Sequence, residues 1–195
     1  MYQIKNILGL VATLLVFIGY VPYLRDVVKR KTKPHLYSWF IWTFVTFIAF
    51  ALQVTHGAGS ASLVTLAAAL MCATVITLGI IYKSRVEIVK TDTIFLILAF
   101  IALGLWVIAK QPILSAILTT LVDLLGFAPT IRKTWNKPYT ETLAFYYLNS
   151  FRFGLAVLAL QNYSVVTTLY PVAWLIANGL FALMLIIRRK KLLVK

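Results

Sequence analysis

Hydrophobic residues run along this chain in long blocks that are separated by short polar breaks. Seven of the blocks are mostly apolar over the roughly 20 residues that a helix needs to cross a membrane. They cover residues 7–24, 36–55, 61–82, 93–109, 112–131, 142–160 and 165–187. Three of the breaks, 56–60, 110–112 and 161–164, are short and contain the Gly, Pro, Asn or Ser that tight turns require. The pattern predicts an all-α integral membrane protein with seven transmembrane helices.

Composition agrees with this fold class. The chain is 62% hydrophobic and only 12% charged, more apolar than a soluble domain of this size can bury. A net charge of +14 would suggest nucleic acid as the partner of a soluble protein. Here the Lys and Arg residues lie between apolar blocks, so membrane topology explains them and we expect no nucleic-acid partner. The single cysteine, Cys72, lies within an apolar block and is expected to be a small packing residue.

The basic residues fall almost entirely on one side of a seven-span topology. Sixteen of the 19 Lys and Arg residues lie in alternate connections and in the C-terminal tail. Only Lys5 and Lys110 fall on the other side, and Arg152 lies inside a span. Cytoplasmic loops carry the excess of Lys and Arg in membrane proteins. We therefore expect a multi-pass protein of the plasma (inner) membrane with its N-terminus outside and its C-terminus in the cytoplasm. The first block ends at basic residues rather than at a small-residue cleavage site, so no cleavable signal peptide is expected.

One segment recurs in the second half of the chain. Residues 19–42 and 126–146 each combine the end of an apolar helix, a basic loop and the start of an aromatic-rich helix. The matched positions are Gly19, Pro22 and Pro34 in the first copy and Gly126, Pro129 and Pro138 in the second. A three-helix unit needs one extra span if its copy is to cross the membrane in the same direction. The sequence thus predicts a 3+1+3 arrangement of two parallel three-helix repeats, residues 1–83 and 112–195, joined by a linker helix in 84–111.

This pattern resembles the PQ-loop superfamily and, within it, the SWEET-type sugar carriers. The resemblance covers nearly the whole chain, and its sharpest motif is a proline near the end of the first and fifth spans, followed by a basic loop. The family's Pro-Gln pair is replaced here by Pro22-Tyr23 and Pro129-Thr130. A proline inside a helix bends it, and the resemblance implies that Pro22 and Pro129 are hinges that open a gate. The alternative is that both prolines simply end their helices near the membrane surface.

Three polar residues of the last three spans are expected at one depth. Asp123, Arg152 and Asn178 each lie about 12–15 Å from the cytoplasmic face, near the middle of a core about 30 Å thick. Polar residues are costly at this depth and indicate function. Asp123 and Arg152 have three interpretations: a structural ion pair, a proton-coupling carboxylate, or a charged pair that grips a solute. The first half has Val16 and Ile48 at the matched positions.

A pocket for a small polar solute is the interpretation that these residues favour. Trp174 shares a helix face with Asn178 and offers stacking beside an amide. The resemblance implies that Asn178 occupies the seventh-span position of the central site, and it adds candidates from the second, third and sixth spans. A threonine in a span often bonds its own helix, which is the alternative for Thr43 and Thr46. The candidate substrate-binding residues are Asn178, Trp174, Asn149, Arg152, Asp123, Ser150, Thr46, Phe50 and Thr74.

We therefore predict a small-solute membrane transporter, SWEET-like for a sugar or for another small polar solute. It would work by alternating access, as a uniporter or coupled to protons. The alternative is a non-transporting receptor or assembly factor of the same fold, or a lipid-handling protein. The sequence carries no catalytic or metal-binding motif, so we expect neither an enzyme nor a cofactor or metal. The expected partners are the lipid bilayer and the solute, while the sequence leaves the oligomeric state open.

Overall fold

The computed structural model describes residues 2–30, 34, 36–82, 90–136, 138–139, 141 and 143–193, and the boundary expected between residues 83 and 84 lies outside this part. Within it the chain is all-helical, which confirms the all-α part of the prediction. The seven helices are α1 (Tyr2–Val28), α2 (Leu36–Thr55), α3 (Ala61–Ile81), α4 (Lys90–Val107), α5 (Pro112–Asn136), α6 (Leu143–Ala159) and α7 (Val165–Leu193).

Three helices, α1, α3 and α7, are long and apolar enough to cross a membrane. The other helices contain shorter apolar stretches in their described residues. Large apolar side chains also point outward: Leu14 is 61% exposed, Ile80 63% and Leu180 62%. Water-soluble monomers rarely show extended apolar patches. The lengths of the three helices and this outward apolar surface support a membrane protein.

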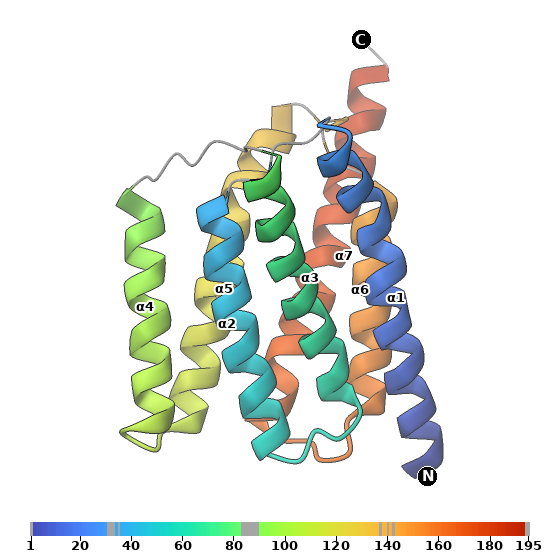
Figure 1. The fold of residues 1–195 in the computed structure, drawn as a ribbon. Coiled ribbons are helices and arrows are strands. Elements are labelled where there is room, and N and C mark those ends of the chain that lie inside the picture. Colours follow the sequence, from blue (N-terminus) through green and yellow to red (C-terminus); the bar gives the residue numbers. More distant parts are fainter. Residues whose placement is uncertain are drawn as a thin grey trace.

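All the helices run roughly along one axis, with the two ends of the chain at opposite ends of the bundle (Figure 1). The N-terminal end, where α1 begins, also carries the turns at residues 56–60, 108–111 and 160–164. The other end, called here the basic end, carries Arg25 on the last turn of α1, Lys29 just after that helix, and Lys190 and Lys191 on the last turn of α7.

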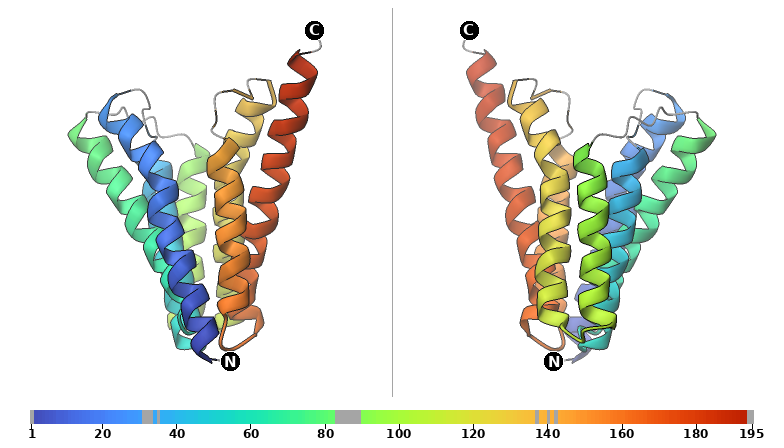
Figure 2. Two further views of the ribbon diagram at one scale, coloured as in Figure 1. Left: turned by 90° about the vertical axis from the view of Figure 1, so that its right-hand side faces the viewer. Right: turned by 90° about the vertical axis from the view of Figure 1, so that its left-hand side faces the viewer.

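The helices pack in two groups of three. In the first group α3 contacts both α1 and α2, and in the second group α7 contacts both α5 and α6. The groups meet where α1 contacts α6 and where α2 contacts α5, while α4 contacts α5 and α2. Figure 2 shows the two groups close together at the N-terminal end and diverging toward the basic end.

Small residues allow the close packing of α1 on α3. Ala12, Ala67, Ala68 and Cys72 lie in one buried cluster together with Val16. Small side chains let the backbones of neighbouring helices approach, which is the usual source of packing energy where lipid replaces water. The contact between α1 and α3 is therefore mainly apolar.

Residues suited to tight turns form the connections between α2 and α3 and between α6 and α7. Gly57 and Gly59 have positive φ angles of 76° and 65°, a conformation that glycine adopts without steric cost. Ser164 and Thr167 exchange hydrogen bonds between side chains and backbone N–H groups at the start of α7, which satisfies donors that the first helical turn leaves free.

Hydrogen bonds join the two groups at the N-terminal end. The pairs are Lys5 Nζ to Leu160 O at 2.6 Å, Gln161 Nε2 to Asn6 Oδ1 at 2.9 Å, and Asn162 Nδ2 to His56 O at 3.0 Å. At the basic end the bonds from Arg188 and Arg189 go to Trp135, Pro138 and Glu141, all on the second group's side. Among the described residues, the hydrogen bonds between the two groups thus include several at the N-terminal end, whereas those of Arg188 and Arg189 at the basic end stay within the second group.

Candidate functional site

A buried carboxyl group lies where α5 meets α7. Asp123 of α5 is 2% exposed, and its Oδ2 accepts hydrogen bonds from the Tyr170 hydroxyl at 2.8 Å and from the Trp174 indole N–H at 2.7 Å. Tyr170 and Trp174 are four residues apart, so they project from the same face of α7. Two donors on one oxygen satisfy a group that would otherwise be very costly to bury.

The first group of helices reaches this site through Thr46 of α2. Its Oγ1 lies 3.3 Å from the Tyr170 hydroxyl oxygen, so Tyr170 connects Thr46 to Asp123. Thr43, one turn earlier, instead bonds the carbonyl oxygen of Trp39 in its own helix at 2.7 Å. Thr43 therefore bonds within its own helix, as the alternative prediction for these two threonines had it, whereas Thr46 contacts another helix.

Arg152 of α6 is buried with part of its guanidinium unused. Its Nε donates to Asn149 Oδ1 at 2.6 Å, and its Cζ lies 4.3 Å from the centroid of the Phe153 ring. Its Nη1 is buried and has no hydrogen-bond partner. A buried unpartnered donor on a charged group is costly, so this nitrogen is the strongest mark of a binding position in the described residues.

Arg152 and Asp123 do not form the direct ion pair that was one of the interpretations of the sequence. Among the described residues the salt bridge within 4.0 Å is the exposed one between Arg25 and Asp26. Each charged group is instead met by neutral partners from its own surroundings.

An aromatic stack connects the two charged groups. The guanidinium of Arg152 lies over Phe153, and Phe153 stacks on Trp174 with a centroid distance of 6.3 Å and an interplanar angle of 15°. Trp174 then donates to Asp123. Cation–π and aromatic contacts of this kind stabilise a charge inside an apolar environment. Asp123, Trp174, Phe153 and Arg152 form one continuous unit, which we call the central cluster.

The central cluster lies at the boundary of the two groups. Ala156 follows Arg152 by one turn and therefore shares its face of α6, and Ala156 packs into the core of α1 and α3. Phe145 of α6 likewise meets Tyr20 of α1 edge-on, with centroids 5.7 Å apart. The face of α6 that carries Arg152 is thus the one turned to the first group.

Other predicted site residues use their polar groups elsewhere. Asn178 is buried and its Nδ2 donates to the Trp174 carbonyl of its own helix at 2.7 Å. The Ser150 hydroxyl joins α6 to the Leu175 carbonyl of α7 at 2.9 Å. Thr74 bonds Leu70 O in its own helix at 2.8 Å, and Phe50 is half-buried. Asn149 lies beside the central cluster, because its Oδ1 accepts the hydrogen bond from Arg152.

Sequence reasoning missed three members of this region. Tyr170 and Phe153 are joined to it by the contacts above, and Thr119 is buried with a hydroxyl that has no partner. Thr119 lies four residues before Asp123 and Tyr170 lies four before Trp174. Helical spacing from residues already identified is the signal that would have found both.

The predicted hinges lie inside helices rather than at their ends. Pro22 is within α1, which continues to Val28, and α5 continues through residue 129 to Asn136; the side chain of Pro129 is outside the described part. Pro171, which was not predicted, lies inside α7 next to Tyr170. A proline removes a backbone hydrogen bond from its helix, so α7 lacks one such bond beside the central cluster.

No known protein family, curated protein or solved structure shows a significant match to this chain.

Proposed function

We propose that this protein is a small-solute membrane transporter that resembles the SWEET-type carriers of the PQ-loop superfamily. The observation that carries the proposal is the central cluster, in which a buried carboxyl group, an indole and a guanidinium with an unpartnered Nη1 lie at the contact between two groups of helices. Buried ionisable groups in membrane helices most often serve solute or ion pathways.

The packing order of the helices supports a 3+1+3 arrangement. The third helix of each group contacts the other two, and the groups touch through the matching pairs α1 with α6 and α2 with α5. This is the pattern expected of two parallel repeats related by an axis along the membrane normal. In this proposal α4 is the linker, all seven helices span the membrane, and the basic end faces the cytoplasm.

The two ends of the bundle support alternating access. The N-terminal end is tied by hydrogen bonds between the groups, such as those of Lys5 and Asn162, while the groups diverge toward the basic end (Figure 2). A carrier in this state would accept solute from the cytoplasmic side. Bending near Pro22, residue 129 and Pro171 would close that side and release the ties at the other.

The chemistry of the cluster favours a small solute with hydroxyl or anionic groups. The free N–H group of Arg152 and the amide of Asn149 offer hydrogen bonds, and the indole of Trp174 offers a stacking surface. A sugar and a zwitterion both meet these requirements. Asp123 is the carboxyl group through which proton coupling would act.

The test is ligand-dependent thermal stability followed by uptake into proteoliposomes. The purified full-length protein is heated with a panel of sugars, amino acids and vitamins at two pH values, because a bound ligand raises apparent stability by mass action. Arg152→Lys and Trp174→Phe should abolish the shift and the uptake. Thr74→Val is the matched control and should keep both, since that hydroxyl bonds only its own helix.

Proton coupling has a separate readout. If Asp123 carries the proton, uptake by the unaltered protein should rise with an inward proton gradient and uptake by Asp123→Asn should not. A panel without any stabilising or transported solute would contradict the transporter proposal and favour a receptor or lipid-handling protein of the same fold.

A further inference from the structure

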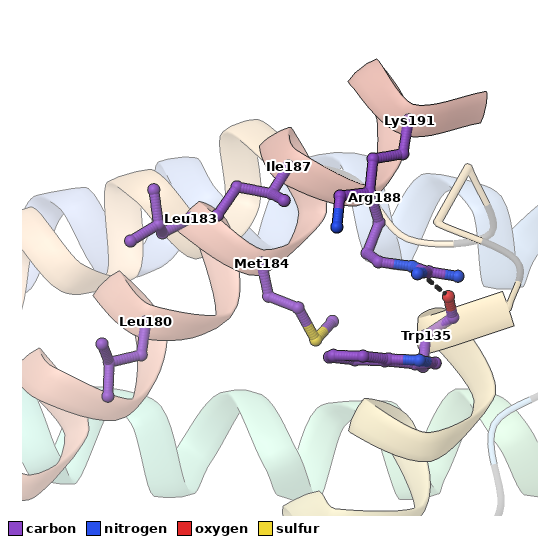
Figure 3. A pocket seen from close by; sticks show the side chains of 7 residues that line it. All are labelled: Trp135, Leu180, Leu183, Met184, Ile187, Arg188 and Lys191. Carbon is purple, nitrogen blue, oxygen red and sulfur yellow. Dashed lines mark hydrogen bonds between the residues drawn. The ribbon is translucent and has the colours of Figure 1, made fainter. Parts of the chain in front are cut away.

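We infer that a groove on the outer surface of α7, near the basic end, binds one anionic phospholipid. The groove has a volume of about 270 Å³ and combines four apolar side chains, one indole and two cations. Its lining residues are Trp135, Leu180, Leu183, Met184, Ile187, Arg188 and Lys191 (Figure 3).

The apolar part of the groove fits within one leaflet of a bilayer. The six lining residues of α7 are spaced so that they share one helix face, and they extend from Leu180 to Lys191. At 1.5 Å per residue the apolar part from Leu180 to Ile187 is about 10 Å long, which lies within the half-thickness of about 15 Å of a hydrocarbon core. Leu180 and Leu183 are well exposed, so an acyl chain can lie along them.

The cationic end of the groove is built around Trp135 of α5. The Nε of Arg188 donates to the Trp135 carbonyl oxygen at 2.7 Å, and the guanidinium Cζ lies 4.9 Å from the centroid of its indole. Figure 3 shows Met184 against the same ring. Lys191 is exposed, and the described lining contains no acidic residue. A phosphate placed here would meet two cations of one site, at the depth where Trp and basic residues mark the membrane interface.

The apolar face and the cationic end together indicate which molecule binds in the groove. A free phosphate would use Arg188 and Lys191 but not the apolar face, and an uncharged lipid would use the apolar face but not the cations. An anionic phospholipid uses both, with its headgroup drawn to the basic residues. This inference concerns the outer surface and does not rest on the transport proposal.

The experiment measures lipid retained by the purified full-length protein in native mass spectrometry. Dioleoyl-phosphatidylglycerol is compared with dioleoyl-phosphatidylcholine, which has the same acyl chains and no net charge. We expect the anionic lipid to be retained preferentially. Lys191→Gln should weaken its binding about fivefold, the change that corresponds to about 1 kcal/mol per basic residue near a headgroup.

Lys190→Gln is the matched control, because this neighbour is exposed, carries the same charge and does not line the groove. It should leave binding unchanged. A second pair tests the apolar part: Leu183→Ser should weaken binding, and Ile176→Ser, an exposed position of α7 outside the groove, should not.

Four results would overturn the inference. These are equal retention of the two lipids, equal loss in Lys190→Gln and Lys191→Gln, displacement of the lipid by inorganic phosphate alone, and a change of oligomeric state in Lys191→Gln without a change in lipid binding. The third would indicate a site for a free anion, and the fourth a contact between two copies of the chain.

Discussion

The two groups of helices share a packing order but differ in what they bury. Val16 of α1 and Asp123 of α5 hold matched positions just before the two recurring segments, three residues before Gly19 and Gly126. Val16 is fully enclosed by the apolar core of α1 and α3, whereas Asp123 is enclosed with two hydrogen-bond donors from α7. Similar helix packing thus accepts a carboxyl group only where a neighbouring helix supplies partners for it.

The largest effect is expected when the carboxyl group is moved to the first group. Val16→Asp would place it in a mainly apolar cluster with Ala12 and Ala68, where the Tyr20 hydroxyl and the Cys72 thiol already contact each other, and should lower the free energy of unfolding by about 4 kcal/mol or more. The measurement is the yield of monodisperse protein and its unfolding in SDS. Val16→Thr is the control of similar shape and should cost much less. A Val16→Asp protein as stable as the parent would show that the first group also has polar partners at this depth.

Removing the carboxyl group from the second group should have the next largest effect. Asp123→Leu leaves the Tyr170 hydroxyl and the Trp174 N–H without their acceptor, and should lower the free energy of unfolding by about 3 kcal/mol. Asp123→Asn keeps an acceptor oxygen and should lose only about 1 kcal/mol. The same unfolding assay compares the two. Equal losses would mean that the two hydrogen bonds do not stabilise the fold.

The smallest effect concerns the first group's contribution to the site. Thr46→Val removes the hydroxyl that meets Tyr170 across the group boundary and should cost about 1 kcal/mol. Thr43→Val removes a hydroxyl that bonds its own helix and should change stability by less than about 0.5 kcal/mol. Thermal unfolding of the two variants side by side decides the point. If both behave alike, the contact between Thr46 and Tyr170 does not join the groups.

The hydrophobic blocks of the sequence located the helices well, but not all of their ends. The block at 142–160 corresponds closely to α6 (Leu143–Ala159), while the block at 165–187 is only part of α7 (Val165–Leu193). Charged residues such as Arg188 and Lys190 end an apolar pattern without ending a helix, because Lys and Arg are good helix formers. Hydropathy therefore located the apolar part of α7 rather than the full length of the helix.

The candidate site was predicted by residue type and depth, and its connections were not. The cost of burying Asp123 and Arg152 made both stand out in the sequence, and the structure brings Trp174, Asn149 and Thr46 to them. Which donor meets which acceptor depends on helix rotation, which a periodic pattern does not specify. The same rotation directs the hydroxyls of Ser150 and Thr74 to backbone carbonyls instead.

The sequence by itself determined the all-helical class, the clustering of charge at one end and the presence of costly polar residues inside apolar helices, because these follow from composition and spacing along one chain. Only the tertiary structure decided that Asp123 and Arg152 are bridged by Phe153 and Trp174 rather than paired directly. It also placed Trp135 of α5 beside Arg188 of α7. Both arrangements depend on contacts between helices far apart in the chain, and side-chain packing across those contacts sets distances that no local pattern encodes.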